Sequence, residues 1–434
     1  MSLSSSLTAG VAGLNVNASK LATISDNIAN AGTYGYKRAE TDFTAMVVGA
    51  QTGAYTAGGV TSTSTRDIAG KGALATSGSS LDLAILGGGF LPVTSAARAG
   101  AGGAVQMQLA PTGSFAPDAD GLLRTNSGLA LLGWPVDANG TTVPAPRQSA
   151  TGLEPIIVPN SSIAAEPTTQ ITLGTNLPAA DTEFGASGTP LSVPIEYFDN
   201  LGASRTLTAT FTPDTTGPGA SNAWSLAIDD SATAPASNPV AEFDIAFSTT
   251  AGIGGTLASV TVAGGGAWNA ATGVATVTTA NGPVEITLGP TGAGSALTQL
   301  AADFAPTGIT KNGAGAGLLT GLEFDAQGYL IGTYDTGLNR RLFQVPLVDV
   351  PNPDGLQAED AGAFSVTNAS GAFYLWDSAD GPVGELTGFA LEESTSDIAG
   401  ELTSLIETQR AYSSNAKVIQ TVDEMLQETT NIKR

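Results

Sequence analysis

Apolar residues recur at intervals of seven at both ends of this chain. The stripe near the start consists of Leu7, Leu14, Leu21 and Ile28, and the stripe near the end of Ile398, Leu405, Tyr412, Ile419 and Leu426. A seven-residue repeat closely matches two helical turns and is typical of a helix that packs along a partner helix. Isolated helices of this length are marginal in water. We therefore expect these nine residues to form an assembly interface, in which the two ends pair as a coiled coil or bind other copies of the chain.

The first helix is expected over residues 2–31. The sequence Asn30-Ala31-Gly32-Thr33-Tyr34-Gly35-Tyr36-Lys37 then breaks the pattern, with Gly32 placed as a C-terminal cap.

Between the predicted helices the pattern changes to short alternating segments, which favour β-strands. One turn formula, an Asp followed three residues later by a Gly, recurs between them. It is found at 118–121, 137–140, 325–328 and, more loosely, 199–202. Asp accepts hydrogen bonds from the turn backbone and Gly supplies positive φ, so these segments are predicted to be hairpin tips.

Composition shifts along the chain predict nested domains. The fold class we expect is mainly β with terminal α-helices, in which the paired helices carry β-rich domains, one inserted into the other. The predicted segments are 1–37 and 386–434 for the helical coiled coil, 38–75 for an extended connector, 76–145 and 318–385 for a β-rich core, and 146–317 for an inserted outer β domain with its linkers.

The charge and the missing residue types exclude several function classes. The 434 residues include 39 acidic and 16 basic ones, for a net charge of −23. This balance disfavours nucleic acid and anionic membranes, because both require basic residues. The chain has neither Cys nor His, which removes thiolate chemistry, histidine bases and the usual zinc ligands. We therefore expect no catalytic site, no metal and no cofactor.

A rival hypothesis from another class is a secreted β-rich glycan-binding protein or glycosidase that uses acidic residues. Neighbouring acids such as Asp229 and Asp230 would have to serve as its carboxylates. Adjacent residues of a strand point to opposite faces, however, so such pairs are poor candidates.

No cleavable secretory signal is visible, because residues 1–17 contain no positive charge. No run approaches the length of apolar residues that a membrane span needs. We expect no membrane insertion, and either a cytosolic location or export without a cleaved signal peptide.

Two longer motifs lie at the two ends of the chain, over residues 25–37 and 409–419. Together they resemble the bacterial family of flagellar rod, hook and hook-associated axial proteins. The motif residues that carry the resemblance are Asn27, Asn30, Thr33, Gly35, Tyr36 and Lys37 near the start, and Gln409, Arg410 and Asn415 near the end. Arg410 lies off the apolar stripe and is either solvated or paired with an acid, such as Glu407 or one on a neighbouring copy. Residues 193–202 are similar to the outer domain of hook subunits, which shorter rod proteins lack.

The resemblance implies a structural subunit, not an enzyme, that polymerises into a curved flexible tube and transmits torque from rod to filament. It implies contacts with other copies of the chain and with rod, hook cap and hook–filament junction proteins. It further implies passage through the flagellar type III export apparatus and an extracellular location in the flagellum. The alternative within the family is a distal rod subunit with an inserted domain.

Overall fold

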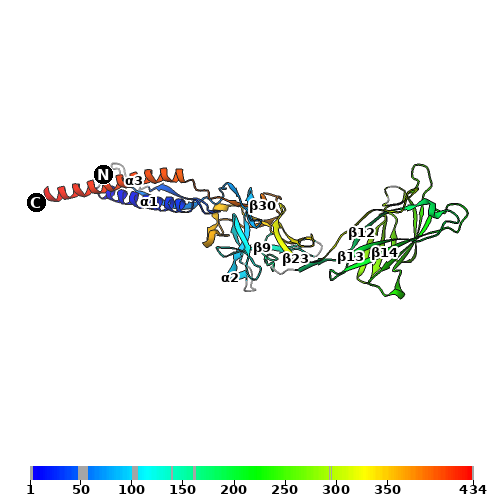
Figure 1. The fold of residues 1–434 in the computed structure, drawn as a ribbon. Helices are drawn as coiled ribbons and strands as arrows, with labels where there is room; N and C mark the ends of the chain where they lie inside the picture. Colours follow the sequence, from blue (N-terminus) through cyan, green and yellow to red (C-terminus); the bar gives the residue numbers. More distant parts are fainter. Residues whose placement is uncertain are drawn as a thin grey trace. The chain divides into compact units, whose positions relative to one another are not determined.

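A computed structural model describes residues 3–46, 57–99, 106–137, 140–159, 163–292, 294 and 296–432. The chain divides into two compact units. The helical unit comprises Met1–Asn160, Leu322–Gly332 and Arg340–Arg434, and the sandwich unit comprises Ser161–Gly321 and Thr333–Asn339. The colours of Figure 1 follow the chain through both units. The sandwich unit is therefore inserted into the helical unit, and each is described by itself below.

The helical unit contains the α-helices of the described residues and the shorter strands. The helices are α1 (Leu3–Ala29), α2 (Ala96–Ala99) and α3 (Ile398–Ile432). The strands are β1 (Ala39–Ala45), β2 (Val60–Arg66), β3 (Leu74–Thr76), β4 (Asp82–Leu86), β5 (Leu91–Ser95), β6 (Gln108–Ala110), β7 (Gly113–Pro117), β8 (Leu123–Thr125), β9 (Leu129–Pro135), β10 (Glu154–Pro155), β26 (Leu347–Asp349), β27 (Gln357–Ala358), β28 (Phe364–Ser365), β29 (Tyr374–Trp376), β30 (Glu385–Gly388) and β31 (Ala390–Glu392).

The sandwich unit is built from longer strands. These are β11 (Ile163–Glu166), β12 (Gln170–Pro178), β13 (Leu191–Phe198), β14 (Ser204–Pro213), β15 (Ala223–Asp230), β16 (Ala241–Phe247), β17 (Leu257–Gly265), β18 (Ala267–Asn269), β19 (Val274–Thr279), β20 (Gly282–Thr287), β21 (Leu297–Leu300) and β22 (Ala305–Lys311). Three further strands include residues of both units: β23 (Ala314–Phe324), β24 (Tyr329–Tyr334) and β25 (Asn339–Gln344).

The two terminal helices lie side by side in the helical unit (Figure 1). They are antiparallel, because Gly10 of α1 faces Ile419 of α3 while Asn27, near the end of α1, bonds to Glu401, near the start of α3. The predicted fold class, mainly β with paired terminal helices, is confirmed.

The segment 38–75 differs from the extended connector that we expected. Strands β1 and β2 form an antiparallel hairpin from Ala39↔Arg66 to Ala45↔Val60. The hairpin packs on α1, where the hydroxyls of Thr41 and Thr23 are 3.0 Å apart. The Thr residues that recur in this segment have high strand propensity, which the composition-based interpretation overlooked.

Two expected boundaries also require correction. Residues 386–388 and 390–392 lie in strands and not in a helical segment, because β30 pairs with β4 and β31 with β3. Helix α3 begins only at Ile398, where Asp397 accepts the backbone N–H of Ala399 at 3.1 Å. Residues 146–159 belong to the helical unit, because β10 pairs with β9 and the neighbouring Leu153 is buried.

The β part of the helical unit packs around strand β9, whose residues Leu129–Trp134 are all buried. Strand β9 pairs with β5, β8, β10 and β25. One buried apolar cluster gathers residues from distant parts of the unit: Ile68, Phe90, Leu109, Leu132, Trp134, Leu153, Val348, Val350, Leu356, Phe364 and Leu375. Segments before and after the insertion therefore share a single core.

The sandwich unit has a five-stranded sheet in the order β13-β14-β15-β16-β17 and a six-stranded sheet centred on β12. Strict alternation along β14 buries Leu207, Ala209 and Phe211 and leaves the intervening threonines less buried. The two sheets enclose a large apolar cluster made only of residues between Ile171 and Leu297. Its core is thus complete within one continuous stretch of chain.

The Asp–Gly turn formula is confirmed at three of its four copies. The Oδ1 atoms of Asp118, Asp199 and Asp325 accept backbone N–H groups two or four residues on, and the matching glycines have positive φ. In the fourth copy, residues 138 and 139 lie outside the described residues. The Gly32 prediction is wrong: α1 ends at Ala29, and Gly35, not Gly32, has positive φ.

Asp230 ties the sandwich unit together at the end of β15. Its carboxylate accepts the hydroxyl of Tyr197 at 2.8 Å, the hydroxyl of Thr233 at 2.8 Å, and the backbone N–H groups of Ala232 at 2.9 Å and Ala280 at 3.1 Å. Burial alone would raise the pKa of Asp230, but these four hydrogen bonds outweigh it and hold the pKa below the ordinary value near 3.8. Asp230 was one of the two neighbouring acids considered above for a glycosidase. Its carboxylate is instead a structural hydrogen-bond acceptor.

We predict that a fragment of residues 167–313 folds by itself. Its ends are joined because the Oδ1 atom of Asn312 accepts the N–H groups of Thr169 and Gln170. Circular dichroism should record β structure and one cooperative thermal transition. Replacing the fully buried Phe211 with Ala should cost about 3–5 kcal/mol. Thr210→Ala, the matched outward-facing control, should cost less than about 1 kcal/mol. A fragment without a cooperative transition would contradict the prediction.

We further predict that Asp230→Asn destabilises this fragment by roughly 2 kcal/mol at neutral pH, because the amide group would oppose two donors. Since the folded-state pKa is lowered, the stabilisation is present above the unfolded value and is lost as pH falls through the folded value. The free energies of unfolding of the two proteins, measured with urea between about pH 7 and pH 2, should therefore become similar only below about pH 4. A difference in the free energy of unfolding that stays constant across this pH range would contradict the prediction.

Candidate assembly site

The contact between α1 and α3 is lined by small and polar residues. A Cβ atom added to Gly10 would lie 3.1 Å from Cγ1 of Ile419, and one added to Gly13 would lie 2.8 Å from Nδ2 of Asn415. The glycines therefore allow the helix backbones to approach closely. On α3, the line facing α1 consists of Glu401, Thr408, Asn415 and Val422, seven residues apart and each buried or half-buried. We call this line the α3 seam.

Ile419, which faces Gly10, is the one stripe residue described above at the close approach of the helices, and the other residues of the predicted apolar stripes flank this contact. On α1, the four residues Leu7, Leu14, Leu21 and Ile28 are all half-buried. On α3, Leu405 and Ile419 are half-buried, while Ile398, Tyr412 and Leu426 are exposed. The most buried apolar residues of the pair are Val16, Ile24 and Val422, none of which belongs to the predicted stripes. Whether the stripes are buried in an assembly remains a prediction.

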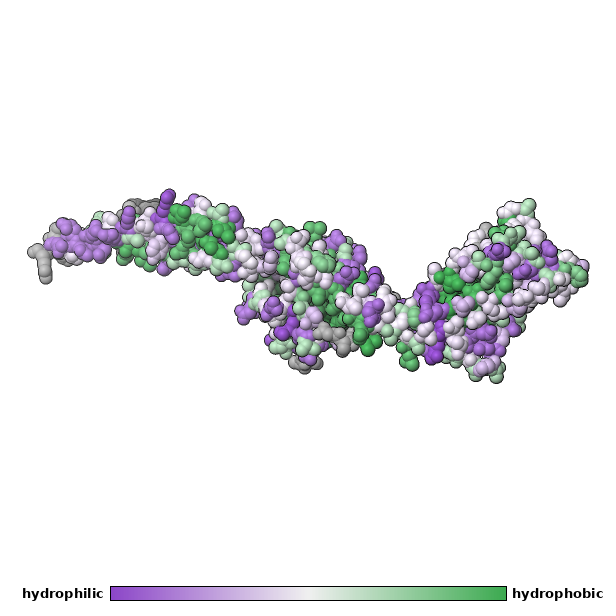
Figure 2. All heavy atoms as spheres, in the orientation of Figure 1, coloured by the Kyte–Doolittle hydropathy of each residue, from purple (hydrophilic) through white to green (hydrophobic). Residues whose placement is uncertain are grey.

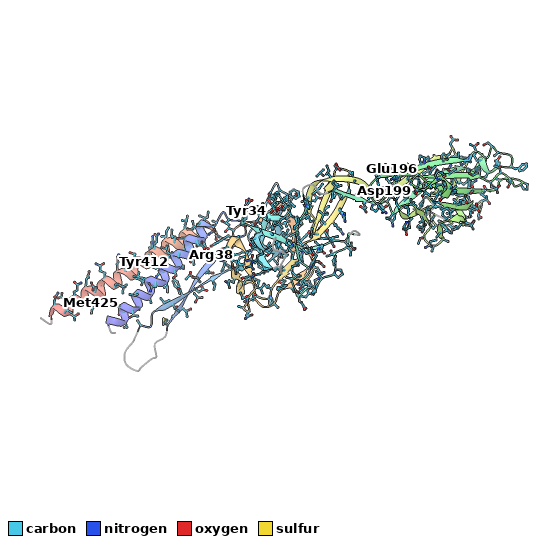
Figure 3. The ribbon with its side chains drawn as sticks, turned by 90° about the horizontal axis from the view of Figure 1, so that it is seen from below. Tyr34, Arg38, Glu196, Asp199, Tyr412 and Met425 are labelled. Carbon is cyan, nitrogen blue, oxygen red and sulfur yellow. The ribbon has the colours of Figure 1, made fainter. Side chains whose placement is uncertain are left out.

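Helix α3 leaves a large apolar surface exposed in the single chain. Its members are Ile398, Leu402, Ile406, Tyr412, Val418, Met425 and Leu426, with exposed fractions from 39% to 53%. Figure 2 shows hydrophobic residues gathered over the helix pair near the β part of the unit. Figure 3 shows Tyr412 and Met425 along α3. Exposed apolar surface of this extent marks a protein interaction site.

A groove of about 260 Å³ opens between the helices. It is lined by Asn17, Ala18, Leu21, Thr408, Gln409 and Tyr412. Leu21 and Tyr412 come from the two predicted stripes, and Gln409 from the C-terminal motif. The groove brings these three residues together.

The N-terminal motif folds into a junction at the base of the helix pair. The Nδ2 atom of Asn27 donates to Oε1 of Glu401 at 3.1 Å and to the carbonyl of Ala39 at 2.8 Å. The same Glu401 oxygen accepts Nε of Arg38 at 2.6 Å. This hydrogen bond, the largest contribution, raises the pKa of Arg38. One carboxylate therefore joins α3, α1 and the start of β1.

Lys37 and Glu392 form a buried ion pair across 355 residues of sequence. The Nζ–Oε1 distance is 2.6 Å, and the side chains are 0% and 2% exposed. Lys37 also donates to the carbonyl of Gly70 at 2.7 Å, and the same Glu392 oxygen accepts the N–H of Gly72 at 2.7 Å. Breaking a buried pair is costly because one charge stays behind uncompensated. The pair therefore fixes both chain ends to the segment between them.

Tyr36 and Gly35 complete the junction. The Tyr36 hydroxyl donates to Oδ2 of Asp26 at 2.9 Å and to Oδ1 of Asn27 at 3.1 Å. Burial and, next, the Asp26 carboxylate raise the pKa of Tyr36 to about 12, so its hydroxyl remains a donor. Gly35 has φ +70°, and an added Cβ would lie 2.8 Å from Thr112. Only glycine fits there.

The remaining motif residues are nearer the surface. Asn30 holds the end of α1 by donating to the carbonyl of Asp26 at 2.9 Å, and its side chain accepts the hydroxyl of Thr33. Asn415 lies on the α3 seam. Gln409 and Arg410 are exposed, and Arg410 forms no ion pair with any residue that the structure describes. The pairing with Glu407 that we considered is thus not formed.

Sequence reasoning missed the acidic partners Glu392 and Glu401 and the close approach at Gly10 and Gly13. Two signals were available. Glycine inside a helix costs about 1 kcal/mol relative to alanine, so two glycines in a leucine-rich helix indicate tight packing. Glu392 follows the apolar pair Ala390-Leu391, an unusual place for a charge without a partner. Neither signal identifies which residue is contacted.

The described residues contain no group of three acidic side chains arranged to hold a metal ion. Among the described helices, none has the length and hydrophobicity that crossing a membrane requires. What the site offers is a set of exposed apolar side chains on a helix that is anchored to the β part of the unit.

We predict that Lys37→Met destabilises the helical unit by about 3–5 kcal/mol, because Glu392 would stay buried and charged. Adding Glu392→Gln should recover much of the loss, since the amide oxygen still accepts the N–H of Gly72. Urea unfolding of the full chain measures the stability of the helical unit. Fragment 167–313 is unfolded separately, so that the transition of the sandwich unit can be identified. A double variant less stable than Lys37→Met would contradict the prediction.

Three family models match the chain. Residues 7–37 match the flagella basal body rod protein model, and residues 388–432 match the C-terminal model of flagellar basal body rod FlgEFG proteins. Residues 159–314 match the flagellar basal body protein FlaE D2 domain. The first two cover the paired helices and their junction, and the third covers the sandwich unit.

Several curated relatives match over their whole length. The flagellar hook protein FlgE of Rhizobium meliloti is 34% identical over 442 residues, with all of both chains covered. That of Brucella abortus is 31% identical, again over all of both chains, and that of Salmonella typhimurium is 30% identical over 99% of this chain and all of its own. A crystal structure of Helicobacter pylori flagellar hook protein FlgE2 superposes with a TM-score of 0.48 at 12% identity, over 73% of this chain and all of that one.

These matches favour neither the distal rod subunit nor the glycan-binding alternative. Full-length similarity to hook proteins, together with the matching D2 insert, identifies a structural subunit of the bacterial flagellar hook. The chain belongs to the flagellar hook protein family.

Proposed function

We propose that this chain polymerises with itself into a helical tube, and that α3 supplies the main apolar contact between copies. The observation that carries this proposal is the exposed apolar surface of α3. A single chain buries α3 through its polar seam and leaves its larger apolar side chains in water. Covering them with a second copy recovers about 25 cal/mol for each Å² removed from water. A different surface must meet them on that copy, because a contact between unlike surfaces propagates along a polymer.

The proposed mechanical role is a curved, flexible coupling that transmits torque from rod to filament. Two features support it. The ion pairs of the junction, the buried Lys37–Glu392 pair and the partly exposed Arg38–Glu401 pair, tie the helices firmly to the β part of the unit. Movement of the helices is thereby passed to the strands. The sandwich unit has its own core, so it keeps its fold while loads act elsewhere.

Further partners are proposed by analogy with the family. They are the flagellar rod, the hook cap and the hook–filament junction proteins, together with the flagellar type III export apparatus. We also propose an extracellular location reached without cleavage of a signal peptide, and a role without catalysis. The absence of Cys and His from the sequence is consistent with that role.

We predict that Ile406→Asp abolishes polymerisation and leaves the folded chain intact. Ile406 is 51% exposed in the single chain, so its replacement costs little there. In the polymer it would place a charge in an apolar contact, at a cost of several kcal/mol that recurs with every copy added. Ultracentrifugation and negative-stain microscopy of purified full-length protein measure assembly, and circular dichroism checks the fold.

The matched control is Thr403→Asp, which introduces the same carboxylate one turn away at an exposed polar position. It should assemble with a critical concentration close to that of the unmodified chain. Normal tubes from Ile406→Asp would reject the proposed apolar contact.

A further inference from the structure

The face of α3 opposite the seam carries a line of charged residues. Arg410, Lys417 and Glu424 are spaced seven apart, and each follows a seam residue by two positions. A step of two residues turns about 200° around a helix, so this line lies on the side of α3 that faces away from α1. All three are exposed in the single chain. Glu428, one turn beyond Glu424, extends the line and is also exposed.

The basic and acidic halves of this line are separated along the helix. Arg410 and Lys417 come first, and Glu424 and Glu428 follow. Opposite charges on one helix interact at spacings of three or four residues, whereas Lys417 and Glu424 are seven apart. None of the four side chains forms an ion pair with any described residue, although Glu424 accepts a hydrogen bond from Gln420 at 3.1 Å. The line therefore cannot neutralise itself within one helix.

Basic residues are scarce in this chain, with 16 against 39 acidic ones. Most basic side chains outside α3 that the structure describes have a partner, either a carboxylate or an aromatic ring. Two basic residues aligned on one exposed face without partners are therefore out of keeping with the rest of the molecule.

We propose that this face binds a second copy of the chain, so that the basic half of one α3 lies against the acidic half of α3 in its neighbour. The proposal rests on the polymerisation proposed above. Copies in a helical polymer share one orientation, so adjacent α3 helices run parallel. At about 1.5 Å per residue, Arg410 and Glu424 are about 21 Å apart along the axis. A stagger of about 21 Å sets Arg410 beside Glu424, and one of about 17 Å sets Lys417 beside Glu428. Staggers in this range therefore bring opposite charges together, whereas unstaggered helices oppose like charges.

The charged line therefore selects the axial register of neighbouring α3 helices. Apolar contacts are not directional and tolerate sliding, whereas like charges placed opposite one another cost free energy. Exposed ion pairs add little affinity each, about 0–1 kcal/mol, so their main effect is to select the stagger. Staggered contacts are also heterologous, as continued growth requires.

Charge reversal of the full-length chain tests the proposal. One variant carries Arg410→Glu with Lys417→Glu, a second carries Glu424→Lys with Glu428→Lys, and a third carries all four changes. Arg98→Glu with Arg340→Glu serves as the control for the first variant, because it changes the net charge by the same amount at exposed or half-exposed positions outside α1 and α3. The readouts are the critical concentration by sedimentation, tube morphology by negative-stain microscopy, and helicity by circular dichroism.

Each two-residue reversal should raise the critical concentration about tenfold or more, through like-charge contacts. The four-residue variant should return to within about threefold of the unmodified chain, because the complementary pairs are restored in swapped form. The control should stay near the unmodified value. Raising salt from about 50 to 500 mM should reduce the differences between the variants, because these charges are exposed.

Two results would overturn the proposal while leaving polymerisation intact: reversed variants that assemble as well as the unmodified chain, or a four-residue variant no better than the two-residue ones. Failure of the unmodified chain to assemble at all would instead contradict the proposed function.

Discussion

The structure of this hook protein depends on the attachment of its two chain ends to each other. Two buried carboxylates make the attachment: Glu392 holds Lys37, and Glu401 holds Asn27 and Arg38. Taking these charges out of water is costly, so they persist only because each finds its partner. The direction of α3, its rotation against α1 and the position of the β1–β2 hairpin all follow from these contacts. The helices are thus a firmly anchored part of the helical unit and not loose tails.

The polar seam between the helices explains how a subunit can be folded and still retain surface for assembly. If the predicted stripes had formed the centre of the intramolecular contact, Ile398, Tyr412 and Leu426 would be covered within one chain, and less apolar surface would remain for other copies. Gly10 and Gly13 instead let the backbones meet closely over Asn415 and Ile419. The bulky side chains of α3 are left outside, where a neighbouring copy can cover them. Under the assembly proposed above, part of the stability of the helix pair would come from contacts in the polymer.

The sandwich unit follows a different principle. Its core closes within one continuous stretch, and Asn312 joins the two ends of that stretch to each other. The helical unit, in contrast, needs residues from before and after the insertion to complete its core, as Trp134 and Leu375 illustrate. An insertion that is stable by itself does not disturb the register of the strands around it. This arrangement permits an inserted domain in a protein whose ends must pair.

The sequence by itself determined the elements that depend on local patterns. The seven-residue repeats indicated terminal helices, the Asp–Gly formula marked hairpin tips, and the two end motifs with residues 193–202 identified the family. It did not determine which helix face turns inward, because a heptad pattern leaves several neighbouring lines of residues possible. The contacts at Gly10 and Gly13, together with the hydrogen bond between Asn27 and Glu401, select one of them. Nor could the sequence show that Lys37 pairs with Glu392. A buried charge requires a partner, but its position in the sequence does not identify that partner. Those choices were made by tertiary structure, through close packing and the cost of burying an unpaired charge.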